Sequence, residues 1–125
     1  MLGRFPISVQ IPAADLARAR SFYESLGAEV VRDLGEIGLV LSSGGYEFGI
    51  YPSPEAGQAA HTLASWLVDD LDREMADLRE RGIVFEEYDL PSLRTVNGVA
   101  DMGPERAAWF RDSEGNILAV AQSVE

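Results

Sequence analysis

A faint internal repeat, with an offset of 55 residues, constrains this chain more than any other feature of its sequence. Each copy has the same order: an apolar alternating stretch, an Asp-Leu pair, an amphipathic stretch, a glycine and a second alternating stretch. The identical positions are Asp15 and Asp70, Leu16 and Leu71, Arg18 and Arg73, and Gly27 and Gly82. This agreement predicts one supersecondary unit used twice, with the active or binding surface where the two copies meet.

The composition excludes several classes of protein. A formal net charge of −11 opposes binding to phosphate backbones, so we expect no nucleic-acid partner. The same charge either attracts a cationic ligand or serves solubility alone. The chain has no cysteine, which excludes disulfides and thiolate chemistry. No apolar run approaches the roughly 20 residues that span a bilayer, and the first residues do not resemble a signal peptide. We therefore expect a cytoplasmic protein with no membrane partner.

Hydrophobic periodicity predicts a first module over residues 1–52. Phe5, Ile7, Val9 and Ile11 alternate with polar residues, which predicts a strand over 5–11 that ends at Pro12. Asp15 is the expected N-cap of a helix that Gly27 ends. Further strands are expected over 29–34, 37–42 and 46–51. Residues 53–61, rich in proline, glycine and small side chains, are the expected linker.

The second module, residues 62–125, is predicted by the same patterns. Its expected elements are a strand over 62–68, a helix over 70–81, a strand over 83–88, and a hairpin of strands 106–111 and 116–122. Residues 89–105 contain turn signals, and we expect part of them to form a mobile loop. Each copy is thus β-α-β-β-β, so the fold class is α+β and the chain is a single domain of two modules.

Three segments, taken together, resemble the vicinal oxygen chelate superfamily, which includes glyoxalase I, bleomycin-resistance proteins and extradiol dioxygenases. They are residues 15–23 with Leu26-Gly27, residues 68–71 with Leu78 and Gly82, and residues 110–116. In the last segment, Ser113 and Glu114 replace the proline and the second aspartate of the family's Asp-Pro-Asp-Gly-Asn turn. The resemblance implies two βαβββ modules that form a curved mixed sheet around a cleft, with the helices on its outer face.

The resemblance also locates the four positions that bind a divalent metal ion in the family's enzymes. Counted from the matching motifs, these positions are Ser8, Gly49, Leu63 and Ala119. Because none of them is a normal metal ligand, no cofactor is expected. A divalent metal stays open through one other pair: His61 and Glu47 each lie two residues before a ligand position, and a register slip would bring them there.

Strand alternation predicts which side chains line the cleft. They are Ser8, Gln10, Glu47, Gly49, Tyr51, Leu63, Ser65, Leu67, Ala119 and Ala121. Trp109 is expected either in the cleft or at a dimer seam, whereas Trp66 is expected in the core. The acidic cluster of Glu86, Glu87 and Asp89 is expected to be a solvated strand end. The cleft therefore suits an amphipathic small molecule better than acid–base chemistry.

These observations favour a metal-free protein that binds a small amphipathic or cationic molecule, as the antibiotic-resistance members of the superfamily do. The first alternative is a glyoxalase-type lyase or isomerase with an atypical metal site or with Glu47 as the base. The second is a non-catalytic interaction domain. The resemblance further implies a homodimer, and the sequence leaves open whether the modules pair within one chain or swap between chains.

Overall fold

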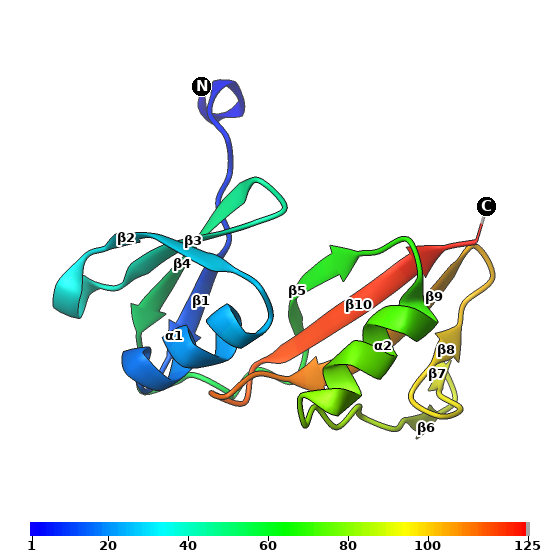
Figure 1. Cartoon of the computed structure of the whole chain (residues 1–125). Coiled ribbons are helices and arrows are strands. Elements are labelled where there is room, and N and C mark those ends of the chain that lie inside the picture. Colours follow the sequence, from blue (N-terminus) through cyan, green and yellow to red (C-terminus); the bar gives the residue numbers. More distant parts are fainter. Residues whose placement is uncertain (125) are drawn as a thin grey trace. The chain divides into compact units, whose positions relative to one another are not determined.

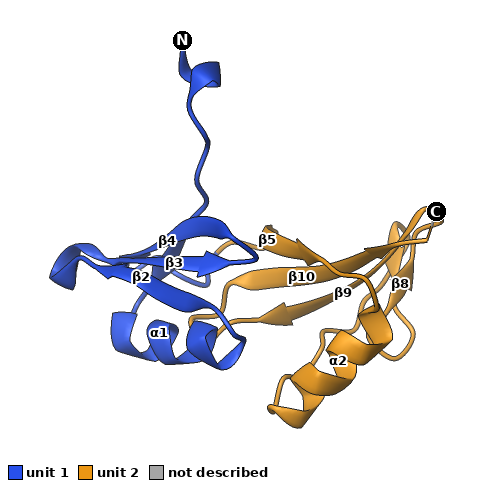
Figure 2. Cartoon of the chain, turned by 45° about the horizontal axis from the view of Figure 1, so that its top comes forward, with its two compact units in different colours: residues 1–58 blue, residues 59–125 orange. Residues whose placement is uncertain are grey.

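The computed structural model describes residues 1–124, which form two compact units. The first unit spans Met1–Gln58 and the second begins at Ala59 (Figure 2). Each unit contains one α-helix and one four-stranded mixed sheet, so the predicted α+β class is confirmed. No helix among the described residues is both long and apolar enough to span a membrane.

Unit 1 has one long helix against a sheet of strand order β1-β4-β3-β2 (Figure 1). Its elements are η1 Leu2–Arg4, β1 Gln10–Ala13, α1 Leu16–Ser25, β2 Glu29–Asp33, η2 Gly35–Ile37, β3 Leu39–Ser43 and β4 Tyr46–Pro52. Strand β1 runs parallel to β4, with Gln10 opposite Gly49, and the other neighbours are antiparallel.

One face of this sheet packs on α1 and the other does not. Tyr23 of α1 is fully buried and meets Phe48 of β4 edge-on, with ring centroids 5.8 Å apart. The remaining buried apolar side chains of the sheet alternate along the strands: Ile11, Ala13, Leu39, Leu41 and Ile50. Because strand side chains alternate between faces, the residues between them, including Gln10 and Glu47, lie on the opposite face.

The predicted first strand over residues 5–11 is wrong in extent. Strand β1 begins at Gln10, while Phe5 is 60% and Ile7 86% exposed. Strand β4 begins at Tyr46, in register with position 7, so the residues before position 7 have no facing strand in unit 1. Figure 1 shows this N-terminal segment extending away from the sheet of unit 1. Pro12 does not end β1, because β1 is an edge strand, where a missing N–H is tolerated.

Unit 2 repeats this plan with strand order β5-β10-β9-β8. Its elements are β5 Thr62–Leu67, α2 Leu71–Glu80, β6 Asp89–Leu90, β7 Leu93–Arg94, β8 Ala100–Asp101, β9 Glu105–Arg111 and β10 Ile117–Ser123. Strand β5 runs parallel to β10, with Ser65 opposite Ala119. This pair corresponds to Gln10 and Gly49 of unit 1, so the repeat seen in the sequence is a repeat of strand pairing.

The predicted strand over 83–88 is also wrong. The segment makes one isolated antiparallel bridge, from Phe85 to Phe110, and the Glu86 N–H donates to the Trp109 carbonyl at 2.8 Å. Further along, Tyr88 bonds to Thr95 instead of to β9. The short strand β8, which lies in the predicted loop 89–105, pairs with β9 at the sheet edge.

The core of unit 2 lies between α2 and one face of the sheet. Leu71 and Met75 of α2 are buried, as are Phe110 and Leu118 of the sheet. Trp66 stacks on Phe110 with ring centroids 6.1 Å apart and planes 15° apart, so it lies on the predicted face of the sheet and borders the core, although it is only half-buried.

The turn between β9 and β10 is built on a buried aspartate. One Asp112 carboxylate oxygen accepts from the backbone N–H groups of Glu114 and Asn116 at 2.8 and 2.9 Å. Its other oxygen accepts from the Asn116 side-chain amide at 2.9 Å. These bonds need Asp and Asn at the two ends of the turn. The serine and glutamate between them are therefore compatible with the same turn.

The two repeated aspartates cap the helices, as predicted. The Asp15 carboxylate accepts from the Arg18 N–H at 3.0 Å, and Asp70 accepts from the Arg73 N–H at 3.1 Å. We expect Asp15→Ala and Asp70→Ala each to lower the free energy of unfolding by about 0.5–2 kcal/mol, because each leaves helical N–H groups without an acceptor. Urea denaturation followed by circular dichroism measures the loss. Asp77→Ala, an exposed interior position of α2, is the matched control, and an equal loss there would contradict the capping role.

Candidate ligand-binding site

The sheet face of unit 1 that α1 leaves uncovered is hollowed. The hollow has a volume of about 670 Å³, within the range of small-molecule sites. All five cleft residues predicted in the first module line it: Ser8, Gln10, Glu47, Gly49 and Tyr51. The sequence pattern therefore located residues that the structure brings together within unit 1.

The floor of the hollow is a glycine covered by an amide. A Cβ built on Gly49 would lie 2.2 Å from Gln10 Oε1 and 2.9 Å from Gln10 Nε2. The Gln10 carboxamide thus occupies the space that a side chain at position 49 would fill. Its Nε2 donates to Ser8 Oγ at 3.2 Å, which leaves a short row of polar groups along the first strand.

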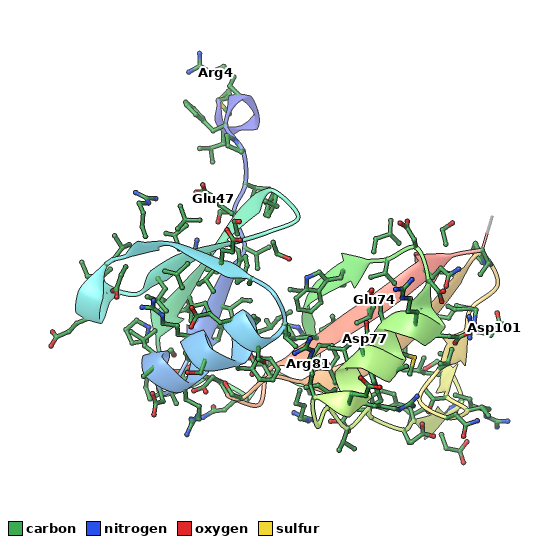
Figure 3. The ribbon with its side chains drawn as sticks, viewed as in Figure 1. Arg4, Glu47, Glu74, Asp77, Arg81 and Asp101 are labelled. Atoms are coloured by element: carbon green, nitrogen blue, oxygen red, sulfur yellow. The ribbon has the colours of Figure 1, made fainter. Side chains whose placement is uncertain are left out.

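The walls of the hollow combine apolar and polar side chains. Leu34 is 44% and Ile37 75% exposed, so both offer apolar surface to a ligand. The Tyr46 hydroxyl donates to the Ile7 carbonyl, which ties the segment before β1 to the start of β4. Glu47 lies near the β3–β4 turn (Figure 3) and Arg32 on β2, so the lining contains both signs of charge. This mixture suits an amphipathic molecule.

One side of the hollow depends on a second glycine. Gly38 is buried with φ of 144°, and a Cβ there would lie 2.3 Å from the Ile50 carbonyl oxygen. A backbone atom cannot move aside as the end of a flexible side chain can. Gly38 therefore fixes the entry of the chain into β3 beside the hollow, a role that the sequence did not reveal.

The other predicted cleft residues lie in unit 2. Cross-strand register places Ser65, Ala119 and Trp109 in one row, and Leu67, Ala121 and Ala107 in the next. Ala119 and Ala121 are buried, Trp109 and Leu63 are half-buried, and Ser65 and Leu67 are exposed. These rows lie on the sheet face opposite to Phe110 and α2.

A β-bulge in this sheet adds a residue that sequence alternation missed. Thr62 pairs with Ile117 and Ala64 with Leu118, so Leu63 is the extra residue between them. The bulge shifts the alternation by one, and Thr62 Oγ1 accepts from the Trp109 indole N–H at 3.2 Å. No sequence signal marks the bulge, because no glycine or proline stands at it.

The positions that hold metal in the superfamily's enzymes do not fit a metal ion here. Gly49 has no side chain, Ala119 is a buried methyl group, and Leu63 is apolar. His61 is exposed, with Nδ1 3.1 Å from the Thr62 carbonyl oxygen. Among residues 1–124, no three or more His, Asp or Glu side chains are grouped so that they could hold an ion.

Solved structures with this fold were found, although no family model and no curated protein matches the chain by sequence. The glyoxalase family protein from Enterococcus faecalis has a TM-score of 0.72 and 25% identity, covering 97% of this chain and 99% of its own. The fosfomycin resistance protein FosX from Listeria monocytogenes has a TM-score of 0.72 and 12% identity, over 96% and 91% of the two chains. TnmS3, an antibiotic binding protein from Streptomyces sp. CB03234, has a TM-score of 0.65 and 21% identity, over 95% and 97%.

These matches define the class of the protein as the two-module fold shared by glyoxalases and by antibiotic-resistance and antibiotic-binding proteins. The fold of this chain is that of the vicinal oxygen chelate superfamily, as the sequence motifs predicted.

The two glycines beside the hollow allow opposite predictions. We expect Gly38→Ala to lower the free energy of unfolding by about 1–3 kcal/mol, because the new methyl group meets backbone at a positive φ. We expect Gly49→Ala to change it by less than about 1 kcal/mol, since the Gln10 amide can rotate away and a strand interior disfavours glycine. Urea denaturation measures both. A large fall in the free energy of unfolding of Gly49→Ala would mean that the Gln10 amide cannot move aside.

Proposed function

We propose that this protein binds a small amphipathic or cationic molecule in the hollow of unit 1 and sequesters it without a resident metal ion. The observation that carries the proposal is the floor of the hollow, where the Gln10 amide covers Gly49 in place of a metal-ligating side chain. A carboxamide and a hydroxyl beside apolar walls can orient a ligand by hydrogen bonds while the apolar surface supplies affinity.

The comparisons support a binding role of this kind. One structural neighbour is described as an antibiotic binding protein and another as a fosfomycin resistance protein. A ligand of antibiotic size matches the volume of the hollow. The chain's net charge of −11 would raise the local concentration of a basic ligand.

We expect calorimetry to detect binding of bleomycin or another basic aromatic antibiotic with Kd in the range of about 1 μM to 1 mM. Leu34→Ala should weaken this binding severalfold, because Leu34 gives its exposed apolar surface to the hollow. Val31→Ala is the matched control, since Val31 is similarly exposed on the neighbouring strand but does not line the hollow. Absence of binding across such compounds, or equal effects of the two variants, would contradict the proposal.

Metal analysis and an activity assay on the same protein distinguish a binding role from the lyase alternative. Protein purified without chelator should contain no stoichiometric Ni, Zn, Mn or Fe and should not turn over hemithioacetals. A stoichiometric metal that is lost in His61→Ala would replace the proposal with metal-dependent chemistry. Metal-independent turnover that is lost in Glu47→Gln would instead assign the carboxylate as a base.

We further propose that the chain forms a homodimer through the N-terminal segment of unit 1. Leu2, Phe5 and Ile7 are 83%, 60% and 86% exposed, which is unusual for clustered apolar side chains. Analytical ultracentrifugation should give a dimer, and Phe5→Asp with Ile7→Asp should shift it toward monomer. Val84→Asp, equally exposed but in unit 2, should leave the dimer intact. A monomer at every concentration would refute this assembly.

A further inference from the structure

Unit 2 carries an aromatic corner in which Trp109, a predicted cleft residue, meets Tyr88, which the sequence did not single out. The rings of Tyr88 and Trp109 have centroids 5.7 Å apart and planes at 84°. Both residues are half-buried, so part of their surface is open to solvent. The two rings pack edge to face, and the surface that each keeps open to solvent can attract a methylated ammonium group through cation–π attraction.

The indole is held so that it offers a face and not a donor. Trp109 lies in β9, paired with Ala119 of β10, and its N–H donates to Thr62 Oγ1 at 3.2 Å. Because an indole has a single donor, this bond leaves the ring with π surface alone for a ligand. The β-bulge that turns Thr62 toward Trp109 is therefore part of the corner.

Tyr88 is held in place by two hydrogen bonds of its own backbone to Thr95. Its N–H donates to Thr95 Oγ1 at 2.8 Å, and the Thr95 N–H donates to the Tyr88 carbonyl at 2.9 Å. These two bonds pin a residue that belongs to no strand. The corner is thus organised before any ligand arrives, which reduces the entropy lost on binding.

Charge around the corner favours a cation. Glu86, Glu87 and Asp89 flank Tyr88 in sequence, and Glu86 pairs with Arg111 at 2.7 Å while Asp89 pairs with Arg94 at 3.4 Å. Glu87 lies exposed between these pairs. Burial raises the pKa of the Tyr88 phenol, the Glu86 carboxylate adds to this rise, and Arg111 opposes it. The phenol is therefore neutral at pH 7.

We infer that the Tyr88–Trp109 corner is a binding site for a compact methylated ammonium group. The class of ligand is a small molecule with a quaternary or tertiary amine, in which the methyl groups contact the two rings and Thr62 takes no part except to orient the indole. The site lies wholly within unit 2 and does not depend on the hollow of unit 1.

Choline chloride and 3,3-dimethyl-1-butanol provide a matched pair of probes, because they share size and shape and differ in the charge. The chain has two tryptophans, so a ¹⁵N–¹H spectrum contains two indole signals. Choline should shift the Trp109 signal with a Kd of about 1–10 mM, and the neutral alcohol should bind at least about tenfold more weakly.

Variants test the rings one at a time. Tyr88→Leu should weaken choline binding about tenfold, whereas Tyr88→Phe, which keeps the ring, should stay within about threefold of the parent. Trp109→Leu removes one of the two indole signals and thereby assigns them. Leu34→Ala in unit 1 should leave choline binding unchanged, so a failure of the hollow and a failure of this corner are distinguishable.

Two results would overturn the inference. Equal binding of choline and the neutral alcohol would make the corner a simple apolar surface. A Trp109 signal that choline does not move at about 100 mM, in protein whose spectrum is otherwise folded, would exclude a site of the expected strength.

Discussion

The parallel pairing of the first and last strands of each unit is the constraint on which the rest depends. It sets Gln10 opposite Gly49 in unit 1 and Ser65 opposite Ala119 in unit 2. Parallel neighbours need a long crossover, and in both units an α-helix that covers one sheet face begins that crossover. The opposite face is left for binding, and small residues stand at its centre in both copies.

The small residues change what the opposite face can do. A glutamate or histidine at position 49 would need the volume that the Gln10 carboxamide fills, so the amide and a chelating side chain exclude each other there. The amide brings one acceptor and two donors without charge, and it orients a ligand instead of polarising it. The hollow therefore offers hydrogen-bonding groups, and no chelating side chain, at this position.

The sequence predicted the parts of the fold that local chemistry determines. Asp15 and Asp70 cap the helices, Gly27 and Gly82 take positive φ after them, and Asp112 organises the last turn. It failed where partners determine the outcome: Phe5, Ile7 and Val9 have the spacing of a strand, yet the residues before position 7 have no facing strand in unit 1, because β4 begins at Tyr46. The bulge at Leu63 is a second case, because register is set by pairing and not by composition.

Net charge alone cannot select the ligand. At physiological ionic strength, exposed charges more than about 8 Å away are largely screened. The net charge of −11 therefore affects how fast a ligand reaches the protein more than which ligand the protein selects. Recognition must come from groups in contact, and in unit 2 those are ring faces whose attraction for a cation is little reduced by salt at short range. Since Glu86 is already paired with Arg111, the rings are a better source of selectivity than the acidic cluster that the sequence makes conspicuous. The acidic cluster is the conspicuous feature of this segment of the sequence, but it is Tyr88, which lies within the cluster, that forms the ring pair with Trp109.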